Sequence, residues 1–178
     1  MTPEPHPKIS AANCYNKCMH QIISFAALYL VFIMVLLPTF IWFRLDRRSK
    51  RQFIIIAIAA AILAFLIAMF AKHFILSPRP FISDHVSALF SSSHDNGFPS
   101  DHTLLASLLA FVTLVYNRPV GLFAVGLAGI VGWARVLGGV HHAKDIFGAF
   151  LISGASVLFT VYVIRKFSRH EQPVKPAS

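Results

Sequence analysis

Five uncharged apolar stretches constrain the fold of this 178-residue chain more than any other feature. They are rich in Ile, Leu, Val, Phe and Ala and cover residues 22–43, 53–71, 103–116, 120–134 and 146–164. About 20 helical residues cross the ~30 Å hydrocarbon core of a bilayer, and unpaired backbone groups are not tolerated there. We therefore predict an all-α polytopic membrane bundle of about five transmembrane helices.

The composition and the N-terminal residues fit a single membrane domain. Hydrophobic residues make up 56% of the chain and charged residues 13%, which argues against a water-soluble globule. The prolines in residues 1–20 do not resemble a cleavable signal peptide. We predict a polar or interfacial leader over residues 1–20, the transmembrane domain over 21–166, and a cytoplasmic tail over 167–178. Cys14 and Cys18 are too few for a disulfide framework, and we predict no role for them.

The net charge of +9 is best explained by membrane topology and not by nucleic-acid binding. If five helices alternate in direction, ten of the 16 Lys and Arg residues fall on one side of the membrane: Arg44, Arg47, Arg48, Lys50, Arg51, Arg118, Arg165, Lys166, Arg169 and Lys175. Positive residues favour the cytoplasmic side. The prediction is therefore an outward N-terminus and a cytoplasmic C-terminus.

Acidic residues and histidines gather in the two predicted outer loops. Pro78 and Pro80 end the second helix, and Ser100 is the expected N-cap of a third helix long enough to span if counted to Asn117. The outer loops hold Asp84, Asp95, Asp101 and Asp145 of the seven acidic residues, and His73, His85, His94, His102, His141 and His142 of the nine histidines. Ionisable groups are costly at membrane depth, so this gathering points to a functional site. Simple solvation of the loops accounts for His73, His85 and His94.

Three short stretches of these loops combine cations, imidazoles and a carboxylate. Arg and Lys side chains pair with phosphate oxygens, and the first N–H groups of a helix attract anions. One histidine could attack phosphorus while another protonates the departing oxygen, and a carboxylate could fix the tautomer of the first. The stretches are Lys72 with Arg79-Pro80, then Pro99-Ser100-Asp101-His102, and then Arg135 with His141 and Asp145.

Each stretch alone has a simpler interpretation. Lys72 could be a lysine that reaches from a helix end to the interface, and Ser100 could be an ordinary N-cap. His141 and Asp145, four residues apart, could be a helix-surface pair or half of a metal site. Their occurrence together, in order and on one face, favours a phosphoryl-transfer site.

The three stretches resemble the signature motifs of the type 2 phosphatidic acid phosphatase superfamily, KxxxxxxRP, PSGH and SRxxxxxHxxxD, across residues 72–145. The variant sequence FPSDHT at residues 98–103 and the short five-helix body are most similar to the bacitracin-resistance type of undecaprenyl-pyrophosphate phosphatase. The resemblance implies a core like that of the vanadium haloperoxidases and a location in the bacterial inner membrane, with the site on the extracytoplasmic face.

The resemblance also implies residue roles. It makes His141 the nucleophile that forms a phosphohistidine, Asp145 the residue that orients it, and His102 the general acid. The residues expected around the phosphoryl oxygens are Lys72, Arg79, Ser100, Asp101 and Arg135. The family needs no metal or other cofactor, and fixed cations can neutralise the phosphate charge.

Two residues depart from the family motifs. Asp101 stands where the family has Gly, and we expect its carboxylate to pair with Arg79, Arg135 or Lys144. Ala134 stands where the family has Ser, so we expect one hydroxyl donor fewer and weaker oxygen binding. We predict no role for His142.

The implied reaction is hydrolysis of undecaprenyl or another polyprenyl diphosphate to the monophosphate, which supports recycling of the envelope carrier lipid and bacitracin resistance. The expected partners are that lipid and the bilayer, and no oligomeric state is indicated. Alternatives are a phosphatase of phosphatidylglycerophosphate, phosphatidate or lipid A, a lipid phosphotransferase, and a metal-dependent membrane hydrolase. A transporter or channel would need ionisable groups near helix midpoints, and the apolar stretches carry none.

Overall fold

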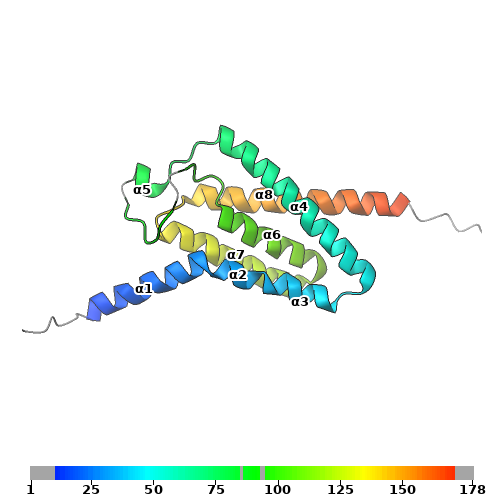
Figure 1. The fold of residues 1–178 in the computed structure, drawn as a ribbon, viewed down its shortest axis with the longest axis horizontal. Coiled ribbons are helices and arrows are strands. Elements are labelled where there is room, and N and C mark those ends of the chain that lie inside the picture. Colours follow the sequence, from blue (N-terminus) through cyan, green and yellow to red (C-terminus); the bar gives the residue numbers. More distant parts are fainter. Residues whose placement is uncertain (1–10, 85, 93–94, 171–178) are drawn as a thin grey trace, which may run out of the picture.

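The computed structural model describes residues 11–84, 86–92 and 95–170, and this part of the chain contains helices and loops with no strand. The predicted all-α class is therefore confirmed. The elements, drawn in Figure 1, are α1 (Ala11–Leu28), α2 (Leu30–Met34), α3 (Leu36–Arg44), α4 (Arg47–Phe74), α5 (Pro80–Ser83), α6 (Asp101–Tyr116), α7 (Arg118–Leu137) and α8 (Ala143–His170).

Three described helices are long and apolar enough to cross a membrane: α4, α7, and α8 as far as Phe167. A fourth candidate span consists of Asn16–Leu28 and Leu30–Arg44, which meet at an angle of 45°. The expected third helix is present as α6, but its 16 residues rise only about 24 Å and are shorter than a full span. This length is tolerated because α6 packs among α2, α3, α4, α7 and α8 and is the central helix of the bundle.

The opposite ends of the bundle differ in how the chain reverses (Figure 1). One end has two short turns. Asp46 caps α4 by accepting hydrogen bonds from two backbone N–H groups, and Asn117 caps α7 by accepting one from the N–H of Val120 at 3.1 Å. The other end carries the long segment between α4 and α6, which includes α5, and the α7–α8 loop, in which Gly139 has φ +70°. Only glycine adopts that conformation without strain.

Small residues let the helices approach closely. The buried face of α4 presents Ala60, Ala64 and Ala68. A Cβ atom at Gly121 of α7 would lie 2.2 Å from the Cα of Leu114. One at Gly148 of α8 would lie 2.2 Å from the ring of Phe98. Such small-residue contacts are typical of helix packing in membranes.

Large apolar side chains cover the outer surface of the bundle. Examples on α4 and α8 are Phe65, Phe70, Phe147, Leu151 and Leu158, each more than half exposed. An apolar surface of this extent suits contact with lipid. The described surface therefore agrees with a membrane-embedded bundle.

The leader and the tail predicted from the sequence remain predictions. Helix α1 begins at Ala11 and continues past residue 20, so the expected leader boundary lies inside a helix. Cys18 is exposed and free, whereas the side chain of Cys14 and the tail residues 171–178 lie outside the described part. So do His85 and His94.

Candidate active site

The loop between α7 and α8 places His141 beside the first turn of α8, where Asp145 lies. Both side chains are buried. The Nδ1 of His141 is 3.5 Å from Oδ2 of Asp145, somewhat longer than an ordinary hydrogen bond. Contacts between catalytic groups often shorten when substrate binds. The pair therefore has the arrangement of an imidazole oriented by a carboxylate.

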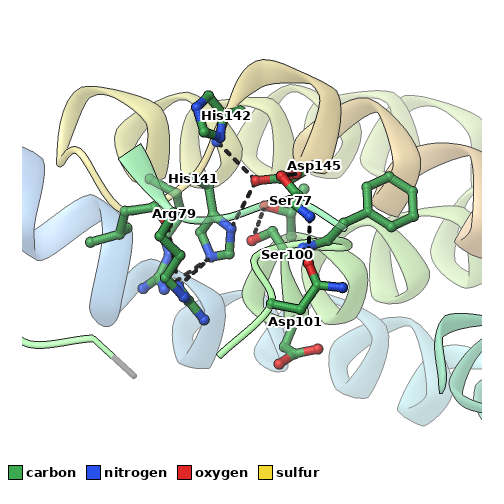
Figure 2. Close-up of polar contacts among 12 residues, drawn as sticks. Ser77, Arg79, Ser100, Asp101, His141, His142 and Asp145 are labelled. Carbon is green, nitrogen blue, oxygen red and sulfur yellow. Dashed lines mark hydrogen bonds and ion pairs between the residues drawn. The ribbon is translucent and has the colours of Figure 1, made fainter. Parts of the chain in front are cut away.

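Two guanidinium groups lie at the other ring nitrogen of His141 (Figure 2). Its Nε2 is 3.3 Å from Nη1 of Arg79 and 3.4 Å from Nη2 of Arg135. Burial lowers the pKa of His141 below its ordinary value, and the two arginines act in the same direction, whereas Asp145 opposes them. The ring is therefore neutral at pH 7 and can keep a lone pair on Nε2.

Polar groups of the long α4–α6 segment hold Arg79. Its Nη2 donates to Oδ1 of Asp95 at 2.8 Å and its Nη1 to Oγ of Ser92 at 2.8 Å. Its Nη1 also donates to the carbonyl of Val140 at 3.2 Å. The guanidinium is thereby fixed close to the loop that carries His141.

Arg135, in the last turn of α7, is held differently. Its guanidinium carbon lies 5.2 Å from the centre of the Phe90 ring, a cation–π contact. Its buried Nε has no hydrogen-bond partner within the described residues. A buried donor of this kind is costly unless an acceptor reaches it, so Arg135 is suited to bind an anion beside His141.

The start of α6 closes the site on a third side. Ser100 is the N-cap residue, as predicted, but its side chain makes no capping bond to the helix backbone. Its Oγ instead accepts from Thr103 Oγ1 at 3.1 Å, and its N–H donates to the carbonyl of Asp145 at 3.3 Å. The N-terminal end of α6, a favourable place for an anion, is thus attached to α8.

His102 lies in the first turn of α6 and is half-buried. It interacts electrostatically with Arg135, His141 and Arg79. The two histidines predicted to share a site therefore lie at the same end of the bundle and within reach of the same charges.

The predicted partners of Asp101 were wrong. Its carboxylate does not pair with Arg79, Arg135 or Lys144, but accepts from Nζ of Lys72 at 2.9 and 3.2 Å. The sequence did not suggest this pair, because Lys72 at the end of α4 and Asp101 at the start of α6 are 29 residues apart. Asp101 is mostly exposed and points away from His141 (Figure 2). Lys72 is therefore at the edge of the site and is already paired.

The sequence left the role of His142 open and favoured an idle loop histidine. Its Nε2 lies 3.2 Å from Oδ2 of Asp84, and its backbone N–H donates to Oδ2 of Asp145 at 2.9 Å. The residue after His141 therefore helps to hold the carboxylate that faces His141.

Sequence reasoning missed two further polar residues, Ser77 and Asn96. Ser77 Oγ donates to Oδ1 of Asp145 at 2.8 Å. The Asn96 amide bonds to the backbone of Ser77, Lys72 and Ile75. Ser77 lies among the unspecified positions of the first motif, which was the only available signal. Asn96 had no signal, because Asn is common in loops.

The sequence also left open that His141 and Asp145 form half of a metal site. Within the described residues, no group of three His, Cys, Asp or Glu side chains is placed to hold a metal ion.

The fold and this phosphate-suited cluster are those of a membrane phosphatase, and comparison with known proteins gives the family. The profile of the PAP2 superfamily matches residues 53–169. Because that match covers more than half of the chain, the chain belongs to the PAP2 superfamily.

Two curated relatives share most of the chain. "Bacitracin transport permease protein BcrC" of Bacillus licheniformis is 28% identical over 152 residues, covering 84% of this chain and 74% of that protein. "Undecaprenyl-diphosphatase BcrC" of Bacillus subtilis strain 168 is 27% identical over 142 residues, covering 78% and 72%. The chain is thus a PAP2 membrane phosphatase homologous to these proteins.

Two solved structures share the fold. The structure of Aquifex aeolicus LpxE has a TM-score of 0.61 and 23% identity, with 89% of this chain and 88% of that chain covered. The PAP2-type phosphatidylglycerolphosphate phosphatase of Bacillus subtilis has a TM-score of 0.55 and 18% identity, with 97% and 82% covered.

Proposed function

We propose that this phosphatase removes the terminal phosphate of undecaprenyl diphosphate or a similar polyprenyl diphosphate through a phosphohistidine. The observation that carries the proposal is the position of His141, whose Nε2 lies beside two guanidinium groups and whose Nδ1 faces a buried carboxylate. A terminal phosphate whose oxygens pair with both arginines would bring its phosphorus close to Nε2.

In the first step, the lone pair of His141 Nε2 forms a bond to the terminal phosphorus. The bond between that phosphorus and the bridging oxygen breaks, and the imidazolium form of His102 gives a proton to the oxygen of the departing lipid monophosphate. Burial and Arg135 lower the pKa of His102 in the free protein, and the negative charge of the bound diphosphate favours the protonated form that this step needs. Positive charge develops on the His141 ring and is balanced by Asp145. Arg79 and Arg135 stabilise the negative charge on the transferred group.

In the second step, water attacks the phosphohistidine. His102, now neutral, takes a proton from that water, and the N–P bond breaks with its electron pair returning to Nε2. Inorganic phosphate leaves, and both histidines regain their starting states. The complete cycle needs only water and the lipid diphosphate.

The choice of a polyprenyl diphosphate is supported by the homology to the two Bacillus proteins, one of which is named an undecaprenyl-diphosphatase. A lipid substrate agrees with a site at the helix ends, where a headgroup phosphate is accessible while the tail remains in the bilayer. The basic turns at the opposite end support a cytoplasmic placement of that end. The site would then be extracytoplasmic, where the enzyme would support carrier-lipid recycling and bacitracin resistance.

Substrate comparison tests the proposal. Phosphate release by the purified protein would be measured with undecaprenyl diphosphate, phosphatidylglycerophosphate, phosphatidate and lipid A, each with excess EDTA. We expect the highest kcat/KM for the diphosphate and no loss of rate with chelator. A preference for another lipid would overturn the substrate assignment, and transfer of phosphate to an added lipid acceptor would indicate a phosphotransferase. Loss of rate with EDTA would indicate a metal-dependent hydrolase.

A further inference from the structure

Ser77 lies in the segment that follows α4 and is 1% exposed. Its hydroxyl donates a hydrogen bond to Oδ1 of Asp145 at 2.8 Å, connecting two residues that are 68 positions apart in the chain. Figure 2 shows Ser77 beside the carboxylate of Asp145. Nothing in the proposed reaction uses this hydroxyl.

Asn96 and Gly97 form hydrogen bonds with the backbone N–H and carbonyl groups of Ser77. The N–H of Ser77 donates to Oδ1 of Asn96 at 2.9 Å, and the carbonyl of Ser77 accepts from the N–H of Gly97 at 2.8 Å. The amide nitrogen of Asn96 donates to the carbonyls of Lys72 and Ile75 at 2.8 and 2.7 Å. The position of Ser77 is therefore fixed to the end of α4.

Gly97 also limits the space around the carboxylate. A Cβ at this position would lie 3.1 Å from Oδ2 of Asp145 and 3.1 Å from the carbonyl oxygen of Ser77. Both contacts are tight, so a side chain here would displace one of the two groups. The backbone of this segment thus passes directly over the carboxylate.

These contacts determine the direction of the Asp145 carboxylate. Oδ1 is engaged by Ser77, and Oδ2 accepts from the N–H of His142 at 2.9 Å while facing Nδ1 of His141 at 3.5 Å. Asp145 is fully buried, so without the Ser77 hydroxyl Oδ1 would lose a hydrogen bond in a site poorly accessible to water. The carboxylate would then turn to recover a donor, and Oδ2 would leave its place at His141.

We propose that Ser77, held by Asn96 and Gly97, is a positioning residue that acts on the nucleophile through Asp145. The inference rests on the proposed function, because it assumes that His141 attacks phosphorus. The Ser77 hydroxyl is engaged with Asp145, so its effect should fall on the chemical step more than on phosphate binding.

The first test is the variant Ser77→Ala, assayed with undecaprenyl diphosphate or with whichever lipid phosphate the wild-type protein hydrolyses best. In metal sites, losing the group that orients a metal ligand typically lowers activity by about 10- to 100-fold, and Ser77 would orient Asp145 in a comparable way. We expect kcat to fall in this range and KM to change less than about threefold. Ser156→Ala is the matched control, because Ser156 is a buried serine of α8 whose hydroxyl donates only to the carbonyl of Ile152 within the described residues, at 2.7 Å. That variant should retain the wild-type kcat.

A double-mutant cycle separates positioning from a general structural role. Residues that act as a unit are not additive. In an Asp145→Asn background, Ser77→Ala should therefore change the remaining kcat by less than about twofold. A full and independent loss in that background would show that Ser77 acts on the fold in general and would overturn the proposal.

Gly97→Ala provides a second variant if Ser77→Ala does not fold. The added methyl group would crowd Oδ2 of the carboxylate and the carbonyl oxygen of Ser77, and it should lower kcat with KM nearly unchanged, again only when Asp145 is present. Wild-type kcat in the folded Gly97→Ala or Ser77→Ala protein would refute the positioning role. If the wild-type protein hydrolyses none of the lipids, the proposed function itself fails. If Asp145→Asn is fully active, the orienting role of Asp145 fails, and the positioning role of Ser77 fails with it.

Discussion

The two ends of the helical bundle differ in what their polar side chains do. At the end with Asp46 and Asn117, a single capping side chain begins each new helix, and the basic residues there are largely exposed. At the site end, buried Arg79, Arg135 and Asp145 are held by hydrogen bonds and ring contacts from the long α4–α6 segment and the α7–α8 loop. The comparison shows that a turn between two helices needs few polar side chains. We therefore expect most of the buried charge at the site end to serve a ligand, and substitutions at the two ends to have different effects.

Replacement of His141 should have the largest effect. His141→Gln keeps a polar side chain of similar size but removes the nucleophile, and kcat should fall by about 10³-fold or more. The protein should still fold, as judged by its thermal unfolding in detergent. Substantial phosphate release by this variant would contradict the assigned nucleophile.

Arg135→Lys should have the next largest effect. Lysine keeps the charge but cannot reproduce the two-pronged contact of a guanidinium with phosphate oxygens. We expect kcat/KM to fall by about 10- to 100-fold. Arg118→Lys makes the same chemical change at the opposite end, on an exposed residue, and should leave kcat/KM unchanged. An equal fall in kcat/KM for the two substitutions would show that the two ends do not differ in their role in phosphate binding.

The pH dependence should reflect the burial of His141. Its pKa is lowered from 6.5, so the neutral nucleophile predominates at pH 7. As the pH falls through this lowered pKa, Nε2 takes up a proton and loses its lone pair. A profile of kcat/KM should therefore show an acid limb with its midpoint below pH 6.5, declining by up to about tenfold per pH unit. A midpoint above 6.5 would contradict the effect of burial and of the arginines.

Asp101→Gly should have a smaller effect, because its ion pair with Lys72 is partly exposed. Such pairs contribute at most about 1 kcal/mol. Without the carboxylate, Lys72 is available to the substrate, and we expect KM to fall by no more than about fivefold with kcat unchanged. An increase in KM would show that Asp101 holds Lys72 in the position that binds phosphate.

Asn117→Ala should leave kcat unchanged. It removes the N-cap of α7 and should lower stability by about 1 kcal/mol, or about 2–4 °C in the unfolding midpoint of a chain of this size. Thermal unfolding and phosphate release measured on the same sample would test both expectations. A loss of kcat in the folded protein would show that the two ends are coupled.

Much of the fold could be predicted because lipid imposes simple rules on sequence. The apolar runs of α4, α7 and α8 had the length of a bilayer, and Pro78, Ser100 and Asn117 stand at or near the predicted helix ends. The break after Leu28 carries no proline or glycine, so the 45° bend depends on packing that a local pattern does not contain. The shortness of α6 likewise follows from its central position.

The candidate site was predictable where charge and spacing carried the signal. The sequence contained the order of Lys72, Arg79, His102, Arg135 and His141 along the chain, and these residues lie at one end of the bundle. Their partners were harder to predict, since Lys72 meets Asp101 only after α4 and α6 have packed. Ser77 and Asn96 have no distinctive chemistry until the fold brings them to Asp145 and to the end of α4.

The close contact at Gly148 has a consequence for how this enzyme can evolve. Gly148 lies three residues after Asp145, and the ring of Phe98 packs against it. Phe98 begins the short segment that leads to Ser100. Even a single methyl group there would lie 2.2 Å from that ring, which would have to move. Substitutions at Gly148 are therefore expected to disturb the site from a distance, and changes in substrate preference are more easily acquired at exposed loop positions such as Val86.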